Sequence, residues 1–441
     1  MKRQMKVVFL ILVFLILAAA ARAGDSLDPL IAPELASLEA LYKHLHANPE
    51  LSHQEKATAE RLSAELQQAG YAVTRGIGGH GFVALMKTGP GPTVLLRTDL
   101  DALPVVEKTG LPYASKARAS SGQGAETGVM HACGHDVHMA CFTGAARVLA
   151  KLRDRWKGAL VMIGQPAEER GTGAVAMLKD GLFTRFPRPD YALALHTDAA
   201  LEAGKIGYRE GFVMANVDTV DLAVRGVGGH GAYPHATRDP VVIAAQIILA
   251  LQTIVSREVR PIDAAVVTVG SIHGGSKHNI IPDQVDLQLT VRSYSEQTRE
   301  QILAAIRRIS TGVARAAGVP PGREPEMKVA SDEFTPATYN DPALVKRLLP
   351  VWKQLLGEAQ VVERDPEMGG EDFSRYGRED PRIPIFLFRV GTVAPERVAE
   401  ARGGGRPLPS LHSALYGPAI HPTLATGVKA MVAAALELLG K

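Results

Sequence analysis

Cysteine is scarce in this chain of 441 residues, which contains only Cys133 and Cys141. The two lie eight positions apart, and the segment from Asp136 to Cys141 has a helical pattern. Eight helical residues span about 12 Å, which is too far for a disulfide bridge. We therefore expect no disulfide, and we predict that one thiol binds a metal while the other packs in the core.

The chain also lacks a surplus of positive charge once its N-terminus is set aside. It has 49 Lys and Arg residues against 46 Asp and Glu residues. Four of the basic residues and none of the acidic ones fall within the first 23 positions, which leaves 45 against 46. A nucleic-acid-binding surface would be basic. The composition therefore argues against a nucleic-acid partner.

A long run made up only of apolar residues lies near the N-terminus. A basic head precedes the uncharged run 7–20, and small residues flank Arg22 before Gly24. The run has 14 residues, fewer than the roughly 20 needed to span a bilayer. These features predict a signal peptide over 1–23, cleaved after Ala23, and an exported, periplasmic or extracellular protein. We expect no later stretch to be long and apolar enough to span a membrane, and therefore no stable membrane anchor after cleavage.

Helix and strand patterns alternate at both ends of the mature chain. Helical patterns are expected within 28–70 and at 137–152, 342–356 and 423–439. Strand patterns, several of them wholly apolar, are expected at 82–86, 93–96, 159–163, 191–195 and 383–389. This alternation predicts a mixed-sheet α/β catalytic domain formed by 24–214 and 332–441, with functional side chains at strand ends.

The order of expected strands and helices changes in the middle of the chain. A strand, a helix, two strands, a helix and a strand are expected in turn at 216–224, 239–258, 264–272, 285–292, 298–317 and 326–330. This β-α-β-β-α-β order is that of a ferredoxin-like domain. We predict an inserted lid or dimerisation domain over 215–331.

The most informative segment is 130–136, Met-His-Ala-Cys-Gly-His-Asp, which places Cys133 and His135 on either side of a glycine. Thiolate and neutral imidazole are ligands for zinc-like ions. Alone the pair is weak evidence, because a buried cysteine usually serves packing. Glu169, His196 and His412 complete a set of five candidate ligands for two ions. Cys133 would bridge the ions and leave room for a water, as catalytic sites do.

Glu168 and Glu169 are adjacent carboxylates, which would repel each other unless cations give them separate tasks. We predict that Glu169 binds an ion and that Glu168 moves a proton from the attacking water to the leaving nitrogen. The alternative is a solvated charge pair, which is less expected because the two closely follow an apolar strand.

Other acids are candidates for supporting roles. Asp101 and Asp136 are expected to orient ligating histidines, with Asp99 a weaker candidate. The alternative for each is a turn or a helix N-cap. The turn 369–372, Gly-Gly-Glu-Asp, carries two acids and could be only a loop.

The Gly-rich segment 228–235 of the insert contains His230. It lacks the Lys-Ser/Thr pair of a phosphate-binding loop, so we predict instead that His230 donates to a developing oxyanion. Asn279 and Arg292 are candidates for binding a substrate carboxylate, the alternative being ordinary surface polar residues. Other histidines are expected to be structural or exposed, namely His131, His138, His235, His273 and His278.

Together these motifs resemble the co-catalytic metal amidohydrolases and peptidases, which include aminoacylases, glutamate carboxypeptidases, hippurate hydrolases and plant indole-acetyl-amino-acid hydrolases. The resemblance runs from about residue 33 to the C-terminus and rests on RTDLDALP, MHACGHD, QPAEE, GGHGAYPH, NIIPD, MGGEDF and LHS. Cys133 stands where many relatives carry a bridging Asp, which is similar to the hippurate hydrolase branch. Val137 and Arg170 depart from that branch, and Arg170 could alter the charge of the pocket.

The resemblance implies two divalent ions, Zn, Mn or Co, held by Cys133, His135, Glu169, His196 and His412. It implies that Glu168 is the general base, that Asp101 supports the metal shell, and that Asn279 and Arg292 lie near the substrate carboxylate. It also implies a homodimer formed through the lid, in which His230 reaches the partner's site.

The expected enzyme is an exported amidohydrolase or carboxypeptidase-like protein. It would hydrolyse the amide bond of N-acyl amino acids or short peptides with a metal-activated water. One alternative is a metal-dependent hydrolase of ureido or cyclic nitrogen compounds. Another is a non-catalytic binding protein on the same fold, against which the complete ligand set argues.

Overall fold

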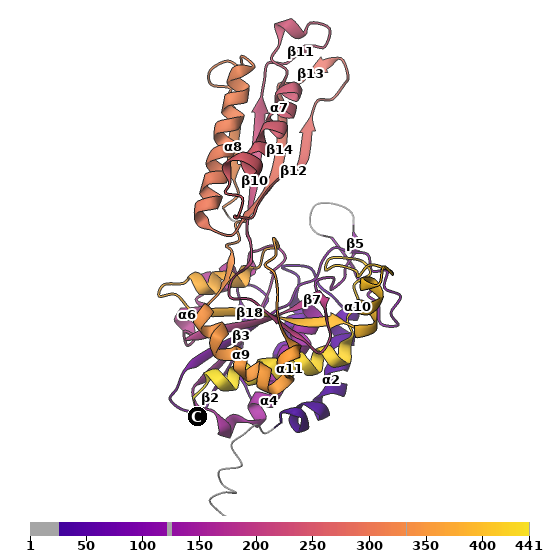
Figure 1. Cartoon of the computed structure of the whole chain (residues 1–441), viewed down its shortest axis with the longest axis vertical. Helices are drawn as coiled ribbons and strands as arrows, with labels where there is room; N and C mark the ends of the chain where they lie inside the picture. The colour runs from indigo at the N-terminus through magenta and orange to yellow at the C-terminus, as the bar shows by residue number, and fades with distance from the viewer. Residues whose placement is uncertain (1–25, 121–125, 332, 441) are drawn as a thin grey trace, which may run out of the picture.

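The computed structural model describes residues 26–120, 126–331 and 333–440. The predicted signal peptide lies outside these residues. The described chain forms a broad α/β body from which a narrower domain projects (Figure 1). We call this projecting domain, residues 216–329, the lid.

An eight-stranded mixed sheet forms the centre of the body. Its strands lie in the order β1 (Ala72–Ile77), β2 (Gly81–Lys87), β6 (Ala159–Gln165), β3 (Thr93–Asp99), β7 (Tyr191–Glu202), β18 (Ile385–Val393), β8 (Ile206–Tyr208) and β17 (Val361–Glu363). The central strands β6, β3, β7 and β18 are parallel, so their carboxyl ends meet at one edge of the sheet. This confirms the predicted mixed-sheet α/β class.

Helices cover both faces of this sheet. One face packs in the largest apolar cluster against α2 (Asp28–Ala47), α3 (Lys56–Gln68), α4 (His135–Lys151), α9 (Pro342–Leu356) and α11 (Ile420–Leu438). The other face packs against α5 (Gly173–Lys179), α6 (Leu182–Arg185) and the 3-10 helix η5 (Asp372–Arg378). The apolar spacing predicts the larger helices correctly, but it missed α10 (Pro395–Arg402), which is short and polar.

The central strands extend further than their apolar runs. The run predicted to end at Leu195 continues in β7 to Glu202, so His196 lies within the strand and not after it. In the same way β18 continues past Arg389 to Val393. The backbone ladder does not depend on side-chain polarity, and Arg389 pairs directly with His196 across the two strands.

The lid contains β10 (Asn216–Arg225), α7 (Pro240–Thr253), β12 (Ala265–Gly274), β14 (Gln284–Ser293), α8 (Glu296–Ala316) and β15 (Glu326–Val329), in the predicted β-α-β-β-α-β order. The sheet order is β12-β14-β10-β15, and every neighbouring pair is antiparallel. The two helices and the sheet enclose an apolar cluster of their own. A short pair, β11 (Gly229–His230) with β13 (Ile280–Ile281), lies at the far end of the lid (Figure 1).

Helix α7 and the π-helical turn η3 (Ile254–Glu258) form an apolar stretch of 19 residues with a mean hydropathy of 1.6. By length and composition this stretch could cross a membrane, so the expectation that no stretch after the leader could do so is wrong on that criterion. Its inward residues, including Ile243, Ile247 and Leu251, belong to the core of the lid. Outward residues such as Leu249, which is 73% exposed, form an uncovered apolar face.

Candidate active site

Cys133 and His135 lie at the start of α4, on either side of Gly134. Gly134 has φ +81°, and a Cβ atom there would lie 2.8 Å from Thr197 Oγ1, so the tight turn requires glycine. Cys133 Sγ lies 3.7 Å from His196 Nε2 of β7. The ligand atoms of Cys133, His135 and His196 all lie within 4.8 Å of one another. The sharp turn therefore brings two of the predicted ligands to the third.

A second group of potential ligands shares the same thiol. The ligand atoms of Cys133, Glu169 and His412 also lie within 4.8 Å of one another. Glu169 Oε1 is 3.6 Å from His412 Nε2 and 3.7 Å from His135 Nε2. All five predicted ligands are thus brought together in two groups that overlap at Cys133, as a bridging ligand requires.

Two atoms of this cluster are buried without a hydrogen-bond partner, His135 Nε2 and Glu169 Oε1. Leaving such atoms unpaired costs free energy, which a bound cation would offset. The other ring nitrogen of His135, Nδ1, lies 2.7 Å from the backbone carbonyl oxygen of Asp101, which orients Nε2 toward the cluster. Sulfur, imidazole nitrogen and carboxylate oxygen together fit divalent transition ions.

The acid–base properties of the cluster also suit a cation. Burial, reinforced by Glu169, raises the pKa of the Cys133 thiol well above its usual range. Burial raises the pKa of the Glu169 carboxyl to about 7, although His135 opposes the shift. Burial and the neighbouring His138 lower the pKa of His196, so this imidazole is neutral and able to ligate. A metal ion would displace the protons from the thiol and the carboxyl when it binds.

Asp99, at the end of β3, contacts two histidines of the site. Its Oδ1 lies 2.8 Å from His138 Nδ1, and its Oδ2 lies 3.7 Å from His135 Nε2. The Thr197 backbone N–H donates to His138 Nε2 at 2.8 Å, so His138 Nδ1 carries the proton and donates to Asp99. The weaker carboxylate candidate of the sequence therefore has a direct place beside the cluster, and His138 has a structural role in it.

The other two carboxylate candidates have additional or different partners. Asp101 Oδ1 lies 3.5 Å from Nδ1 of the ligating His135, as expected of a supporting acid, and its Oδ2 accepts from Ser52 Oγ at 2.6 Å and from the Glu169 backbone N–H at 3.0 Å. It therefore holds the loop that carries Glu169. Asp136 Oδ2 lies 2.6 Å from His46 Nδ1, so it orients a residue outside the predicted ligand set. Neither partner could be identified from local sequence, because Ser52 and His46 are remote in the chain.

The loop between β6 and α5 is held in an unusual conformation just before the two glutamates. Ala167 has φ +50°, which is strained for a residue with a Cβ atom. Its backbone N–H donates to Glu55 Oε1 at 2.7 Å, and the same oxygen accepts from His53 N–H at 2.9 Å. The Glu55 side chain is fully buried. The sequence pattern did not reveal Glu55, whose position before a helix gives no sign of this contact.

Glu168 faces a second pair of acids, Glu371 and Asp372, with carboxylate oxygens within 4.8 Å. The buried Arg97 guanidinium contacts both acids, at 2.9 Å from Glu371 Oε1 and 3.2 Å from Asp372 Oδ1. Burial, followed by the charge of Glu371, raises the pKa of Glu168 well above its usual range. A carboxyl shifted in this direction suits proton transfer near neutral pH. The turn 369–372 is therefore part of the site.

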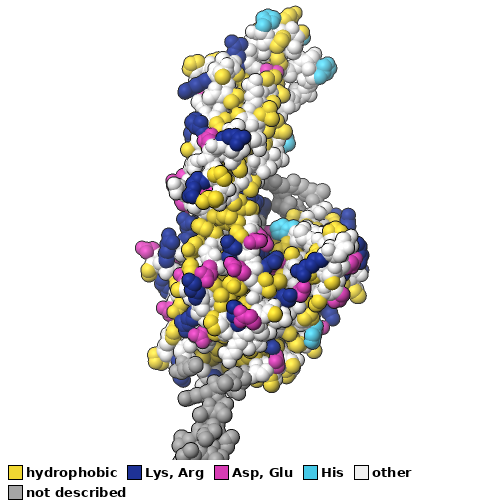
Figure 2. Space-filling model, in the orientation of Figure 1, with side chains coloured by type: hydrophobic (Ala, Val, Ile, Leu, Met, Phe, Trp, Pro, Cys, Tyr) yellow, Lys and Arg dark blue, Asp and Glu magenta, His cyan; other side chains and the backbone are white. Residues whose placement is uncertain are grey.

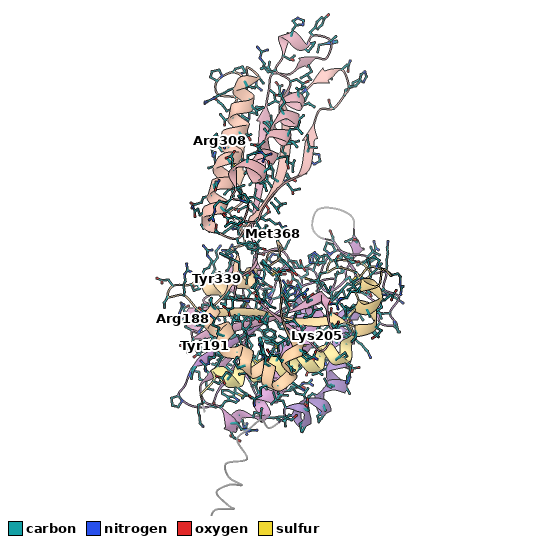
Figure 3. All side chains as sticks on the ribbon, in the orientation of Figure 1. Arg188, Tyr191, Lys205, Arg308, Tyr339 and Met368 are labelled. Atoms are coloured by element: carbon teal, nitrogen blue, oxygen red, sulfur yellow. The ribbon has the colours of Figure 1, made fainter. Side chains whose placement is uncertain are left out.

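The cluster opens into a pocket of about 870 Å³ between the body and the base of the lid. From the lid, Val217, Thr219 and Arg292 line the pocket. Arg292 Nη1 donates to the Met368 carbonyl oxygen at 2.8 Å, and Figure 3 shows Met368 at the junction of lid and body. One of the two predicted carboxylate-binding residues is thus in the pocket of its own chain.

His230 and Asn279 are not brought to this pocket. His230 is exposed in β11, and the adjacent Gly231 N–H donates to the Asn279 carbonyl oxygen at 2.9 Å. Both therefore lie at the far end of the lid (Figure 1), where the space-filling view also shows histidine side chains (Figure 2). Within one chain, the predicted oxyanion donor His230 and the predicted carboxylate-binding residue Asn279 are remote from the ligand cluster.

Arg389 is a pocket residue that the sequence pattern did not reveal. It lies in β18 directly beside His196 of β7, lines the pocket and is 3% exposed. Its Nη2 donates to Glu367 Oε2 at 2.9 Å. A single charge in the otherwise apolar run 385–390 was the only signal in the sequence that could have identified it.

Comparison with known proteins links this geometry to a family. Residues 95–400 match the model of peptidase family M20/M25/M40. The chain is 37% identical to a hippurate hydrolase of Campylobacter jejuni, over 77% of this chain and 86% of that protein. It is 36% identical to thermostable carboxypeptidase 2 of Saccharolobus solfataricus, over 78% and 84%. A crystal structure of a dinuclear metal-binding peptidase of the M20 family from Bacillus subtilis superposes with a TM-score of 0.73 at 29% identity, over 92% of this chain and all of the other.

Proposed function

Because the chain belongs to peptidase family M20/M25/M40 and is a metal-dependent hydrolase of amide bonds, we propose that it hydrolyses N-acyl amino acids or short peptides. The observation that carries the proposal is the pair of ligand groups that overlap at Cys133, with Glu168 beside them. A binding protein would have no need of a proton-transfer carboxyl at that place. The products would be a carboxylate and a free amino acid.

The described residues divide the work of the reaction. Two divalent ions held by Cys133, His135, Glu169, His196 and His412 would activate water and polarise the amide carbonyl. Glu168 Oε2 lies 3.8 Å from His135 Nε2. Glu168 takes the proton of the attacking water and delivers it to the leaving nitrogen. Asp101 and Glu55 accept backbone hydrogen bonds from the loop that contains Glu168 and Glu169, and so hold it in place. Arg292 binds the carboxylate of the substrate at the base of the lid.

We further propose a homodimer formed through the lid. The apolar outer face of α7 is uncovered, and Ile272 on the sheet-edge strand β12 is 52% exposed. Unpaired strand edges and contiguous exposed apolar surface are features of association sites; Figure 2 shows hydrophobic side chains along the visible face of the lid. A two-fold pairing would let the far end of each lid carry His230 and Asn279 to the partner's pocket, where His230 would donate to the oxyanion.

Export is proposed from the N-terminal sequence, which predicts cleavage after Ala23. The protein would then act in the periplasm or outside the cell. N-terminal sequencing of the protein recovered from each cell fraction would test this. A full-length cytoplasmic product that starts at Met1 would contradict it.

The activity is tested by turnover of defined substrates. Purified protein, reloaded with Zn, Mn or Co, is incubated with N-acetyl, N-benzoyl and indole-acyl amino acids and with dipeptides, and free amino acid is measured. We expect release of amino acid from at least one class and loss of release with a chelator. Ammonia or carbamoyl products from ureido compounds would favour the alternative hydrolase. Binding of substrates without turnover of any would favour a binding protein.

A further inference from the structure

Arg389 occupies a place where a charged side chain needs an explanation. It is on the central strand β18, and its parallel neighbour is His196, so the two side chains project from the same face of the sheet. Leu387, on that same face two residues earlier, packs in an apolar cluster. Phe388 and Val390 on either side of Arg389 are fully buried on the opposite face. The surrounding packing would accept an apolar residue here more readily than a cation.

The ion pair of Arg389 compensates its burial only in part. The side chain of Arg389 is 4% exposed, whereas that of its partner Glu367 is 47% exposed. A buried guanidinium is costly unless its donors are well paired, and an apolar residue in its place is often neutral or stabilising. Its Nη2 contacts Glu367, and the group lines the pocket. This placement indicates that Arg389 serves the pocket and not the stability of the strand.

Arg292 and Arg389 contact consecutive residues, Met368 and Glu367. Arg389 of the body contacts the carboxylate of Glu367, and Arg292 of the lid contacts the carbonyl oxygen of Met368. Both line the pocket. The two cations therefore contact the segment 367–368 from different domains and offer two separate donor groups to the same pocket.

The charges in the rest of the pocket are close to balanced. Glu168 and Glu169 belong to the ligand cluster, and Glu371 and Asp372 are paired with Arg97. The other charged side chains that line the pocket are three cations and two acids: Arg170, Arg292, Arg389, Glu333 and Glu367. Counted together with Arg97, Glu371 and Asp372, the charged side chains outside the ligand cluster are four cations and four acids, so acids do not outnumber cations around Arg292 and Arg389.

We propose that Arg389 is a specificity-determining residue that binds a second anionic group of the substrate, in addition to the α-carboxylate at Arg292. The inference rests on the proposed function, and it names the substrate class. Preferred substrates are N-acyl amino acids or dipeptides that carry one further carboxylate. That carboxylate belongs either to an acidic amino acid or to a dicarboxylic acyl group.

Matched acid and amide substrates test the proposal and separate these two sources. The metal-loaded protein is assayed with N-acetyl-L-glutamate against N-acetyl-L-glutamine, and with N-succinyl-L-alanine against N-succinamoyl-L-alanine. We expect kcat/KM for the acid to exceed that for its amide by about tenfold or more in one pair, the scale of a hydrogen bond to a charged group. The pair that shows the preference identifies which side of the amide bond carries the second carboxylate.

Three variants assign the preference to Arg389. In Arg389→Met the ratio of acid to amide should fall toward one, and in Arg389→Lys, which keeps the charge, it should be partly retained. The matched control is Arg364→Met: Arg364 lies beside Arg389 above Gly207, pairs with Asp198 and does not line the pocket. Its ratio should stay at the wild-type value.

The outcomes separate the two proposals. Hydrolysis of acids and amides with equal kcat/KM by the wild type would overturn the role of Arg389 while leaving the proposed function intact. An equal loss on acid and amide in Arg389→Met would also overturn it, because the residue would then only help to hold the shared α-carboxylate. If Arg389→Met does not fold, the wild-type ratio and the Arg389→Lys variant decide the question. If the protein hydrolyses neither these four compounds nor any other amide, the proposed function is contradicted instead.

Discussion

Cys133 Sγ lies 3.7 Å from His196 Nε2, and the same sulfur belongs to the group formed with Glu169 and His412. A single buried thiol is therefore within reach of both halves of the ligand cluster. The other cysteine, Cys141 of α4, is also buried and forms no disulfide, but no potential ligand group surrounds it among the described residues. The two cysteines offer a direct comparison of a ligating thiol with a packing thiol.

Replacement of Cys133 by serine should reduce the metal content below the two ions per chain that we expect for the wild type. An alcohol is a poorer bridging ligand than a thiolate, so loss of one sulfur should weaken both positions. Elemental analysis after dialysis measures the effect. Cys141→Ala is the control and should retain the wild-type metal content. Two tightly held ions in Cys133→Ser would rule out the bridging role.

Glu168→Gln and Glu169→Gln should differ in metal content although the residues are adjacent. Glu168→Gln should keep its ions while kcat falls by about 10² or more, the scale of a lost proton-transfer group. Glu169→Gln should lose metal affinity, because an amide oxygen is a weaker ligand than a carboxylate. Elemental analysis and steady-state kinetics on the same preparations give both quantities. Equal metal content in the two variants would contradict this division of roles.

Glu55→Ala should lower kcat by about tenfold and should also cost about 1–3 kcal/mol of stability, because the buried Ala167 N–H loses its acceptor. The buried carboxylate accepts the Ala167 N–H and so holds a residue with φ +50° in a conformation that costs about 1 kcal/mol or more. Without it, the loop that carries Glu168 should relax. Glycine tolerates this conformation, so Ala167→Gly in the Glu55→Ala background should recover part of kcat. An absence of recovery, with the metal content unchanged, would show that Glu55 does not act through the Ala167 backbone.

His46 should contribute stability that depends on pH. Burial opposes its charge, but the hydrogen bonds to Asp136 and Glu107 outweigh this and raise the pKa of His46 from 6.5 to about 9. The contribution, on the order of 3 kcal/mol, is fully present below pH 6.5 and is lost as the pH rises through 9. The destabilisation caused by His46→Gln should therefore be larger at pH 6 than at pH 9.5 in denaturant unfolding. His44→Gln, an exposed position on the same helix, is the control.

The proposed dimer predicts complementation between two impaired variants. His230→Ala should keep its metal and turn over slowly, and Glu168→Ala should be inactive. After subunit exchange about half of the dimers are mixed, and each mixed dimer has one site with Glu168 and the partner's His230. Activity should then approach roughly a quarter of wild type. Exchange that is shown to occur without any return of activity would mean that His230 does not act across subunits.

The residue pattern was sufficient for the class of fold because each element has a local signal. Apolar runs of strand length predict the buried central strands, and 3.6-residue spacing predicts α2, α4, α9 and α11. The candidate metal ligands could also be predicted from the sequence. A thiol, imidazoles and a carboxylate at strand and helix ends suit a divalent ion whatever their exact placement. The order of elements in the lid likewise follows from local patterns alone.

The partners of individual side chains were decided by tertiary structure. Glu55 meets Ala167 across more than a hundred residues, Asp136 meets His46, and Arg389 lies beside His196 only because β18 and β7 are neighbours in the sheet. The length of the lid carries His230 and Asn279 away from the pocket of their own chain, and their local motifs do not specify this separation. Hydrogen bonds, burial and charge act over a few ångströms in space, and local sequence does not specify which remote residues will come within that distance.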